Sequence, residues 1–159
     1  IERNEFAEWA PVYGQFYGTP RTALTVMMEQ GIDVLLEIDS QGAMQIKKKY
    51  ADAVYIYILP PSLETLRLRL QQRGSDAPEE IPRRLQKARE EVWSYREYYY
   101  IVRNEDLTQA ARELEAVVLA ERIKTKRLDI GWLEENFIRD REEKSSERSR
   151  SANGQRRTE

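Results

Sequence analysis

The segment Val34–Gly42 constrains this chain more than any other, because an apolar run ends there in two carboxylates. It reads Val-Leu-Leu-Glu-Ile-Asp-Ser-Gln-Gly, with Glu37 and Asp39 two residues apart. On a β-strand, that spacing puts both side chains on the same face. Ligands of a parallel α/β sheet bind beyond the carboxyl ends of its strands, where these acids would meet a metal ion and phosphate groups. The segment therefore predicts one part of a nucleotide-binding site.

Composition narrows the chemistry that such a site can use. The chain contains no cysteine and no histidine, which excludes disulfides, thiol catalysis and the commonest general base. Carboxylates, Arg, Lys and Tyr remain, together with an oxygen-bound metal, and this set suits phosphoryl transfer. The formal net charge of −2 argues against a nucleic-acid partner, which usually meets a basic stripe.

The length of the chain and its apolar runs limit how many domains and membrane spans it can contain. The 159 residues are enough for one domain with a buried core. No apolar run reaches the length of a membrane span and no signal peptide is visible, so we expect a cytoplasmic protein without a membrane partner. The chain begins with Ile-Glu-Arg-Asn and not with Met, and we expect the natural amino terminus to lie upstream.

Strand-like and helix-like segments alternate along the chain, which predicts an α/β fold with a doubly wound parallel sheet. We expect strands at 33–38, 53–59 and 99–103, and helices at 20–31, 41–49, 62–72, within 76–95 and at 106–127. From Arg139 onward nearly all residues are charged or small and polar, so this part is predicted to be a disordered tail.

Two of the expected helices have start signals that involve proline. Thr19 is predicted to be a hydroxyl N-cap, with Pro20 at the first helical position. Further along, Asp76 and Glu79 have the spacing of a capping box. Pro82 would then fall inside the helix, where it is expected to kink or delay it.

Several groups of residues resemble guanylate kinases, in order and at matching spacing. They are Phe6–Ala10, Phe16–Thr19, Val34–Gly42, Ile58–Ser62, Gln72–Gly74 with Arg83–Leu85, and Asn104–Leu107. The resemblance covers roughly Ile1 to Arg127. It implies a P-loop nucleoside monophosphate kinase fold, which uses ATP and Mg²⁺ to convert GMP into GDP.

The resemblance also implies a division of the chain into regions. Residues 1–32 correspond to part of the GMP-binding region, 33–72 and 89–130 to the core, 73–88 to the lid and 131–159 to a C-terminal extension. The family carries a glycine-rich loop ending in Gly-Lys-Ser/Thr, and these 159 residues contain no such sequence. We therefore expect a carboxyl-terminal portion of a guanylate kinase with an incomplete sheet. We expect it to be inactive alone, because that loop binds the ATP phosphates and Mg²⁺.

The GMP-binding residues implied by the resemblance are Glu8, Tyr17, Thr19 and Glu37. The role of Glu8 makes chemical sense, since one carboxylate can accept hydrogen bonds from both N1–H and the 2-amino group of guanine. Adenine instead presents an acceptor at N1. From sequence alone, an acid beside Trp9 is more often a solvated surface group, and Thr19 also has a competing role as an N-cap.

The catalytic residues implied by the resemblance are the lid arginines Arg69, Arg73 and Arg84, together with Asp39. Guanidinium groups stabilise the charge that spreads over a transferring phosphoryl group. Asp39 is implied to lie near Mg²⁺ and phosphate and to reach the ion through water, with no direct protein ligand expected. In the competing interpretation, Asp39 or its neighbour is simply the N-cap of the next helix. Asn104 is implied to frame the adenine of ATP.

Two alternatives remain open at this point. The first is a non-catalytic, guanylate-kinase-like module that binds proteins or phosphopeptides. Retention of the acidic pair and all three lid arginines favours the enzyme, because a peptide binder has no need for the full set. The second is a kinase of another nucleoside monophosphate, against which the carboxylate of Glu8 argues.

Overall fold

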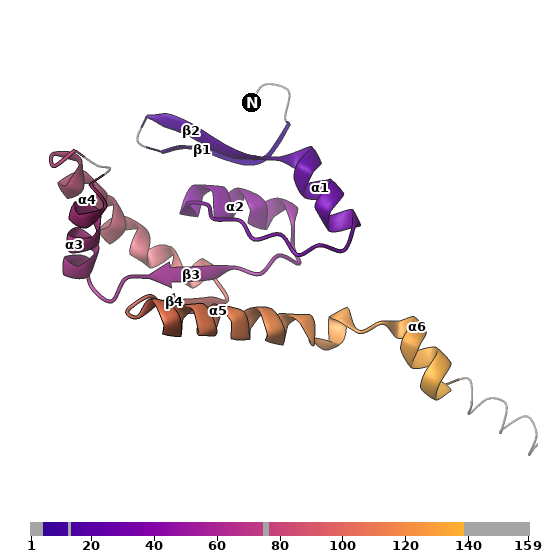
Figure 1. The fold of residues 1–159 in the computed structure, drawn as a ribbon. Helices are drawn as coiled ribbons and strands as arrows, with labels where there is room; N and C mark the ends of the chain where they lie inside the picture. Colours follow the sequence, from indigo (N-terminus) through magenta and orange to yellow (C-terminus); the bar gives the residue numbers. More distant parts are fainter. Residues whose placement is uncertain (1–4, 13, 75–76, 139–159) are drawn as a thin grey trace, which may run out of the picture. The chain divides into compact units, whose positions relative to one another are not determined.

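The computed structural model describes residues 5–12, 14–74 and 77–138 (Figure 1). The chain divides into two compact units, residues 1–115 and 116–159. In the first unit the elements are β1 (Phe6–Val12), β2 (Gln15–Pro20), α1 (Arg21–Glu29), α2 (Ser40–Lys49), β3 (Ile56–Leu59), α3 (Leu63–Arg73), α4 (Glu80–Glu91), the 3₁₀ helix η1 (Val92–Glu97), β4 (Tyr100–Arg103) and the start of α5 (Leu107–Arg122). Within the described ranges, no helix has the length and apolar character needed to cross a membrane.

An antiparallel hairpin of β1 and β2 opens the fold, and the sequence patterns did not predict it. Gly14 lies in its turn with a φ of +80°, a conformation that favours glycine. The register sets Glu8 opposite Thr19 and Trp9 opposite Gly18. Because paired residues on one face lie close together, this register brings the Glu8 and Thr19 side chains together.

The second sheet pairs β3 with β4 in parallel, with Ile56 opposite Tyr100. The connection between them runs through α3, α4 and η1, and α3 and α4 lie side by side (Figure 1). This confirms an α/β fold with a parallel strand pair. In the part of the chain that the structure describes, that sheet has these two strands and no third.

The strand predicted at 33–38 is wrong, although its apolar alternation does have a structural role. These residues form neither helix nor strand, because no described strand pairs with them and an extended segment gains its ladder hydrogen bonds only from a neighbour. Val34, Leu36 and Ile38 nevertheless pack against the core, while Leu35 between them is 76% exposed.

The core of the first unit lies between the hairpin and the helices that follow it. Ala7 of β1, Leu24 of α1, Ile46 of α2 and Tyr55 just before β3 are all buried and form one cluster. Burial of apolar side chains is the main favourable contribution to folding, so this cluster stabilises the hairpin on the helices.

Helix α2 lies beside β1 (Figure 1), and polar side chains of α2 also hold this strand in place. The backbone N–H of Trp9 donates to Oε1 of Gln45 at 3.2 Å, and Nε2 of Gln45 donates to the Trp9 carbonyl at 2.6 Å. One turn further along α2, Nζ of Lys49 donates to the Ala7 carbonyl at 2.7 Å. These bonds satisfy backbone groups of β1 that β2 does not pair.

The predicted cap of α1 is wrong, because Thr19 belongs to β2. Pro20, predicted at the first helical position, is instead the N-cap, so α1 begins one residue later than the sequence suggests, and no side chain caps this helix. Three other helix starts follow local sequence. Asp39 accepts from Gly42 N at 2.9 Å, Ser62 accepts from the backbone N–H three residues on at 3.0 Å, and Asp106 does the same at 2.8 Å.

Helix α4 begins later than the predicted capping box allows. Its N-cap position is Glu79, without a side-chain hydrogen bond, and Asp76 lies outside the described residues. Pro82 is the third residue of the helix. Backbone N–H groups of the first turn have no helical acceptor, so the missing donor of Pro82 leaves no hydrogen bond unmade, and the late start at Glu80 is the expected delay of the helix.

The second unit contains the end of α5, the 3₁₀ helix η2 (Thr125–Arg127), α6 (Ile130–Leu133) and the π-helical turn η3 (Glu134–Ile138). Helix α5 ends at Arg122, five residues before the predicted end, and a turn at residues 123–124 followed by η2 covers the rest of that range. Asp129 caps α6 by accepting from Trp132 N at 3.2 Å. The tail predicted from Arg139 lies outside the described residues.

The substitution Gln45→Ala tests how the hairpin is held. Removing the amide leaves the N–H and carbonyl of Trp9 without their partner, so we expect the free energy of unfolding to fall by about 1–3 kcal/mol. Urea denaturation of the 159-residue chain measures this change. The matched control is Gln72→Ala on α3, whose side chain is exposed and which should shift stability by less than about 0.5 kcal/mol. Equal effects of the two substitutions would contradict the assignment.

Candidate functional site

Glu8 is the most constrained of the predicted site residues. It is only 3% exposed, and its carboxylate accepts a hydrogen bond from Oγ1 of Thr19 at 2.7 Å. The bond crosses the hairpin between residues that the register sets opposite each other. Thr19 therefore acts on Glu8 and not as a helix cap, which settles the competition between its two predicted roles. The other carboxylate oxygen lies against Gly42, in the first turn of α2.

Asp39 lies at the start of the same helix and has three polar neighbours. Its Oδ1 accepts from the backbone N–H of Gly42, and its Oδ2 accepts from Gln41 at 3.2 Å. Nζ of Lys87, from α4, lies 3.8 Å from the same Oδ2. Asp39 is thus the N-cap of α2, as one of the two sequence interpretations proposed, and it also faces a cation on a different element.

A second connection joins α2 to α4 beside this ion pair. Oγ of Ser40 donates to Glu91 at 3.1 Å, and Lys87 lies 3.3 Å from the same carboxylate oxygen. Asp39 and Ser40, at the start of α2, therefore contact Lys87 and Glu91 in the last two turns of α4. Lys87 belongs to residues 73–88, which the family resemblance identifies as the lid, so one of these contacts joins that region to the acidic end of the Val34–Gly42 segment.

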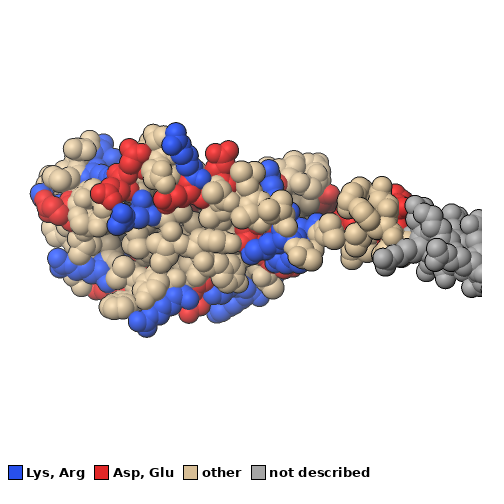
Figure 2. Space-filling model, turned by 90° about the horizontal axis from the view of Figure 1, so that it is seen from below, with Lys and Arg blue, Asp and Glu red and all other residues tan. Residues whose placement is uncertain are grey.

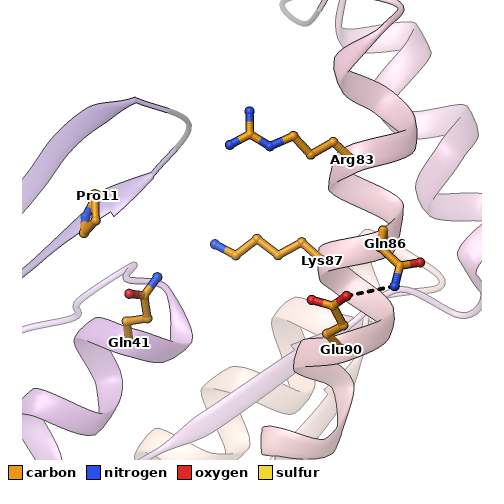
Figure 3. A pocket seen from close by; sticks show the side chains of 6 residues that line it. All are labelled: Pro11, Gln41, Arg83, Gln86, Lys87 and Glu90. Carbon is orange, nitrogen blue, oxygen red and sulfur yellow. Dashed lines mark hydrogen bonds between the residues drawn. The ribbon is translucent and has the colours of Figure 1, made fainter.

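A cavity of about 400 Å³ lies between the hairpin and α2 on one side and α4 on the other (Figure 3). Pro11 and Gln41 line the first side, and Arg83, Gln86, Lys87 and Glu90 line the second. Figure 3 shows the side chains of Arg83 and Lys87 extending from α4 toward the opposite wall, while Gln86 donates to Glu90 at 2.8 Å. The volume falls in the range of small-molecule sites, and the wall from α4 carries two cations.

A second cavity, of about 410 Å³, contains three of the predicted site residues. Its lining consists of Ile58, Pro60, Leu66, Arg69, Leu70, Gln72, Arg73 and Asn104. Arg69 donates to the carbonyls of Asn104 and Glu105 at 2.7 and 3.1 Å, which fixes the loop after β4 against α3. Ile58, Pro60, Leu66 and Leu70 supply its apolar lining, and Gln72, Arg73 and Asn104 add polar groups beside Arg69.

Three predicted site residues belong neither to the group around Glu8 and Asp39 nor to the second cavity. Tyr17 is 62% exposed on β2, and Glu37 is also exposed. Arg84 is half-buried on α4 and lines neither cavity. The structure thus gathers the predicted residues into two groups, one around Glu8 and Asp39 and one around Arg69, and leaves these three outside both.

Sequence reasoning missed Arg83 and Lys87, although a signal for them exists. Residues four apart lie on the same face of a helix, so the spacing of these two cations of α4 is the signal. The sequence could not show that this face looks into a cavity, because that depends on where α2 and the hairpin lie. Gln45 was missed for the same reason.

The side chains around Asp39 decide whether protein groups could ligate Mg²⁺ directly at this place. Among residues 5–12, 14–74 and 77–138, no group of three His, Cys, Asp or Glu side chains could together hold a metal ion. Asp39 itself already accepts hydrogen bonds and faces Lys87. These residues do not fit a direct magnesium cage. Mg²⁺ commonly binds proteins through few carboxylates and keeps several waters and substrate phosphates as ligands.

The charges on one face of the molecule are mixed. In Figure 2, Lys and Arg side chains alternate with Asp and Glu side chains around an area of other residues. That face therefore shows no continuous basic stripe of the kind that tracks a nucleic-acid backbone.

Comparison with known proteins identifies the family of this chain. Residues 1–121 match the protein family described as guanylate kinase. A guanylate kinase from Carboxydothermus hydrogenoformans is 45% identical over 141 residues, which cover 89% of this chain and 69% of that protein. One from Nitrosospira multiformis is 48% identical over 125 residues, covering 79% of this chain and 60% of that protein.

A solved structure gives the same result for the fold. The crystal structure of guanylate kinase from Anaplasma phagocytophilum superimposes with a TM-score of 0.70 at 34% identity, covering 86% of this chain and 67% of that one. The chain belongs to the guanylate kinase family. It spans only part of the length of each of these relatives.

Tyr98 offers a pH-dependent test of the packing behind Asp39. Burial, and after it Tyr57, Asp39 and Glu91, raise the pKa of Tyr98 to about 12 from 10.0. The folded state therefore keeps this proton at a pH where the unfolded chain has lost it. We expect the free energy of unfolding to fall as the pH rises from about 10 to about 12.

Urea denaturation at several pH values across this window measures the effect. Tyr98→Phe removes the titrating hydroxyl, so its stability should depend less steeply on pH. Tyr17→Phe, at a position 62% exposed, is the matched control and should keep the wild-type dependence. A Tyr98→Phe curve parallel to the wild type would show that this hydroxyl does not contribute.

Proposed function

We propose that this chain contributes the GMP-binding and lid parts of a guanylate kinase reaction. In that reaction the γ-phosphoryl group of ATP passes to the phosphate of GMP, which yields GDP and ADP. The observation that carries the proposal is the buried carboxylate of Glu8, held by Thr19 at 2.7 Å. Membership of the family supports the same reaction.

Guanine recognition follows from the chemistry of this carboxylate. Burial of a charged group is unfavourable unless hydrogen bonds satisfy it, and Thr19 supplies one. The N1–H and 2-amino groups of guanine lie side by side and would supply two more. Adenine would turn the acceptor N1 toward the carboxylate and would repel it. Tyr17 and Glu37 stay as proposed contacts of GMP on the strength of the family resemblance alone.

The lid residues are proposed to neutralise and position the phosphates. Arg73 and Arg84 are assigned to the phosphoryl group in transfer, because guanidinium groups pair well with phosphate oxygens. Arg69 holds the backbone of Asn104 and is proposed to orient the adenine of ATP against the second cavity. Asp39 is proposed to act near the phosphates through water. ATP enters as its magnesium complex, and the ion is part of that substrate.

These 159 residues by themselves are proposed to bind GMP without turning it over. They contain no Gly-x-x-x-x-Gly-Lys-Ser/Thr sequence, whose backbone N–H groups, lysine and hydroxyl cradle the ATP phosphates and magnesium in P-loop kinases. Phosphoryl transfer depends on positioning and on charge neutralisation, so a chain without those groups should lack measurable rate.

Glu8→Gln tests the proposed role of the carboxylate. Isothermal titration of the 159-residue chain with GMP should show binding, and AMP should bind far more weakly. The amide offers guanine only one acceptor and no charge, so Glu8→Gln should weaken GMP binding roughly ten- to a hundredfold. The matched control is Glu5→Gln, an exposed acid at the start of the same hairpin, and it should bind GMP like the wild type.

An assay of ADP formation from GMP and ATP with magnesium completes this test. Turnover by the 159-residue chain would overturn its proposed inactivity. Binding of phosphopeptides without binding of GMP would instead support the non-catalytic module and would refute the proposed function.

A further inference from the structure

The inference concerns Gly42 in the first turn of α2, which faces the buried carboxylate of Glu8. A Cβ atom placed on Gly42 would lie 2.5 Å from Oε2 of Glu8 and 3.2 Å from its Cδ. The first separation is shorter than any side-chain contact allows, and the second is a tight contact, while the next atom, Cβ of Ile38, would lie at an ordinary 3.4 Å. The Glu8 carboxylate therefore occupies the volume that any side chain at position 42 would need.

The backbone of Gly42 does not itself require glycine. Three described glycines have a positive φ, and Gly42, inside a regular helix, is not one of them. Alanine is a better helix former than glycine at such a position. The reason for glycine here is thus the contact with Glu8 and not the conformation of the helix.

Two groups from different elements determine where the carboxylate lies. On one side, Thr19 of β2 donates to Oε1 at 2.7 Å. On the other side, the bare Cα of Gly42 lets Oε2 approach α2. The helix is held in turn by its cap, because Asp39 accepts from the N–H of Gly42 at 2.9 Å. The carboxylate is therefore seated between a strand and a helix end that both have fixed positions.

We propose that Gly42 is a specificity-determining position, whose missing side chain places the Glu8 carboxylate where it accepts both guanine donors, with Thr19 as the positioning residue opposite it. The inference rests on the proposed function. Gly42 is assigned no contact with the base and acts through Glu8, and the positioning role of Thr19 is carried by its hydrogen bond to the same carboxylate.

The nature of the contact makes the inference testable without loss of the fold. The atoms that a new Cβ would strike are the far end of a flexible side chain, so Gly42→Ala is expected to push the carboxylate aside and leave the backbone in place. Since alanine favours the helix, the melting temperature of Gly42→Ala should equal or exceed that of the wild type. Affinity for guanine should fall all the same.

The experiment compares GMP with IMP, which keeps N1–H but lacks the 2-amino group. Isothermal titration of the 159-residue wild type should show tighter binding of GMP. Gly42→Ala should weaken GMP binding by at least about tenfold and IMP binding less, so that the preference shrinks. Thr19→Val should shrink it in the same direction. Lys48→Ala introduces alanine at an exposed site of the same helix and should leave the preference unchanged.

The outcomes separate this inference from the proposed function. A wild type that prefers GMP, together with a Gly42→Ala variant that keeps the full preference, would overturn the inference and leave the function standing. A fall in melting temperature with equal losses for GMP and IMP would also overturn it, since Gly42 would then be needed only for folding. A wild type without preference for GMP would refute both.

Discussion

The two hydrogen bonds between the Gln45 side chain and the backbone of Trp9 are the contact on which the rest of the site depends. They hold β1 against α2, and they satisfy polar groups that would otherwise be buried without partners. Once β1 is placed in this way, Glu8 faces the first turn of the helix, where Gly42 accommodates its carboxylate. A carboxylate on an isolated hairpin would be solvated and mobile, and it would recognise nothing.

The amino-terminal end of α2 joins the parts of the site. On one side it meets the hairpin that carries Glu8, and on the other it meets α4 through the Lys87–Asp39 and Ser40–Glu91 contacts. A ligand in the cavity between α2 and α4 would therefore contact β1, α2 and α4, and both β1 and α4 are held in place by contacts with α2. This arrangement explains how residues distant along the sequence can act on a single small molecule.

Local signals in the sequence predicted local features well. Asp39, Ser62 and Asp106 cap helices whose first residues lie within one residue of the predicted starts, because a side chain that accepts from an N–H three residues on needs nothing from the rest of the fold. Long-range pairing was predicted less well. The aromatic segment 5–17 was not recognised as part of a hairpin, and 33–38 was predicted as a strand although no described strand pairs with it.

The sequence by itself determined the alternation of apolar side chains at 34–38 and the approximate starts of most helices. It also determined which acids and arginines are available for chemistry, and the resemblance to a family. The tertiary structure decided which of several possible roles each residue has. Thr19 bonds to Glu8 instead of capping α1, Arg83 and Lys87 face a cavity, and Glu8 is buried. The physical reason is that capping and periodicity depend on neighbours in sequence. Burial and cross-strand contacts depend instead on elements that only folding brings together.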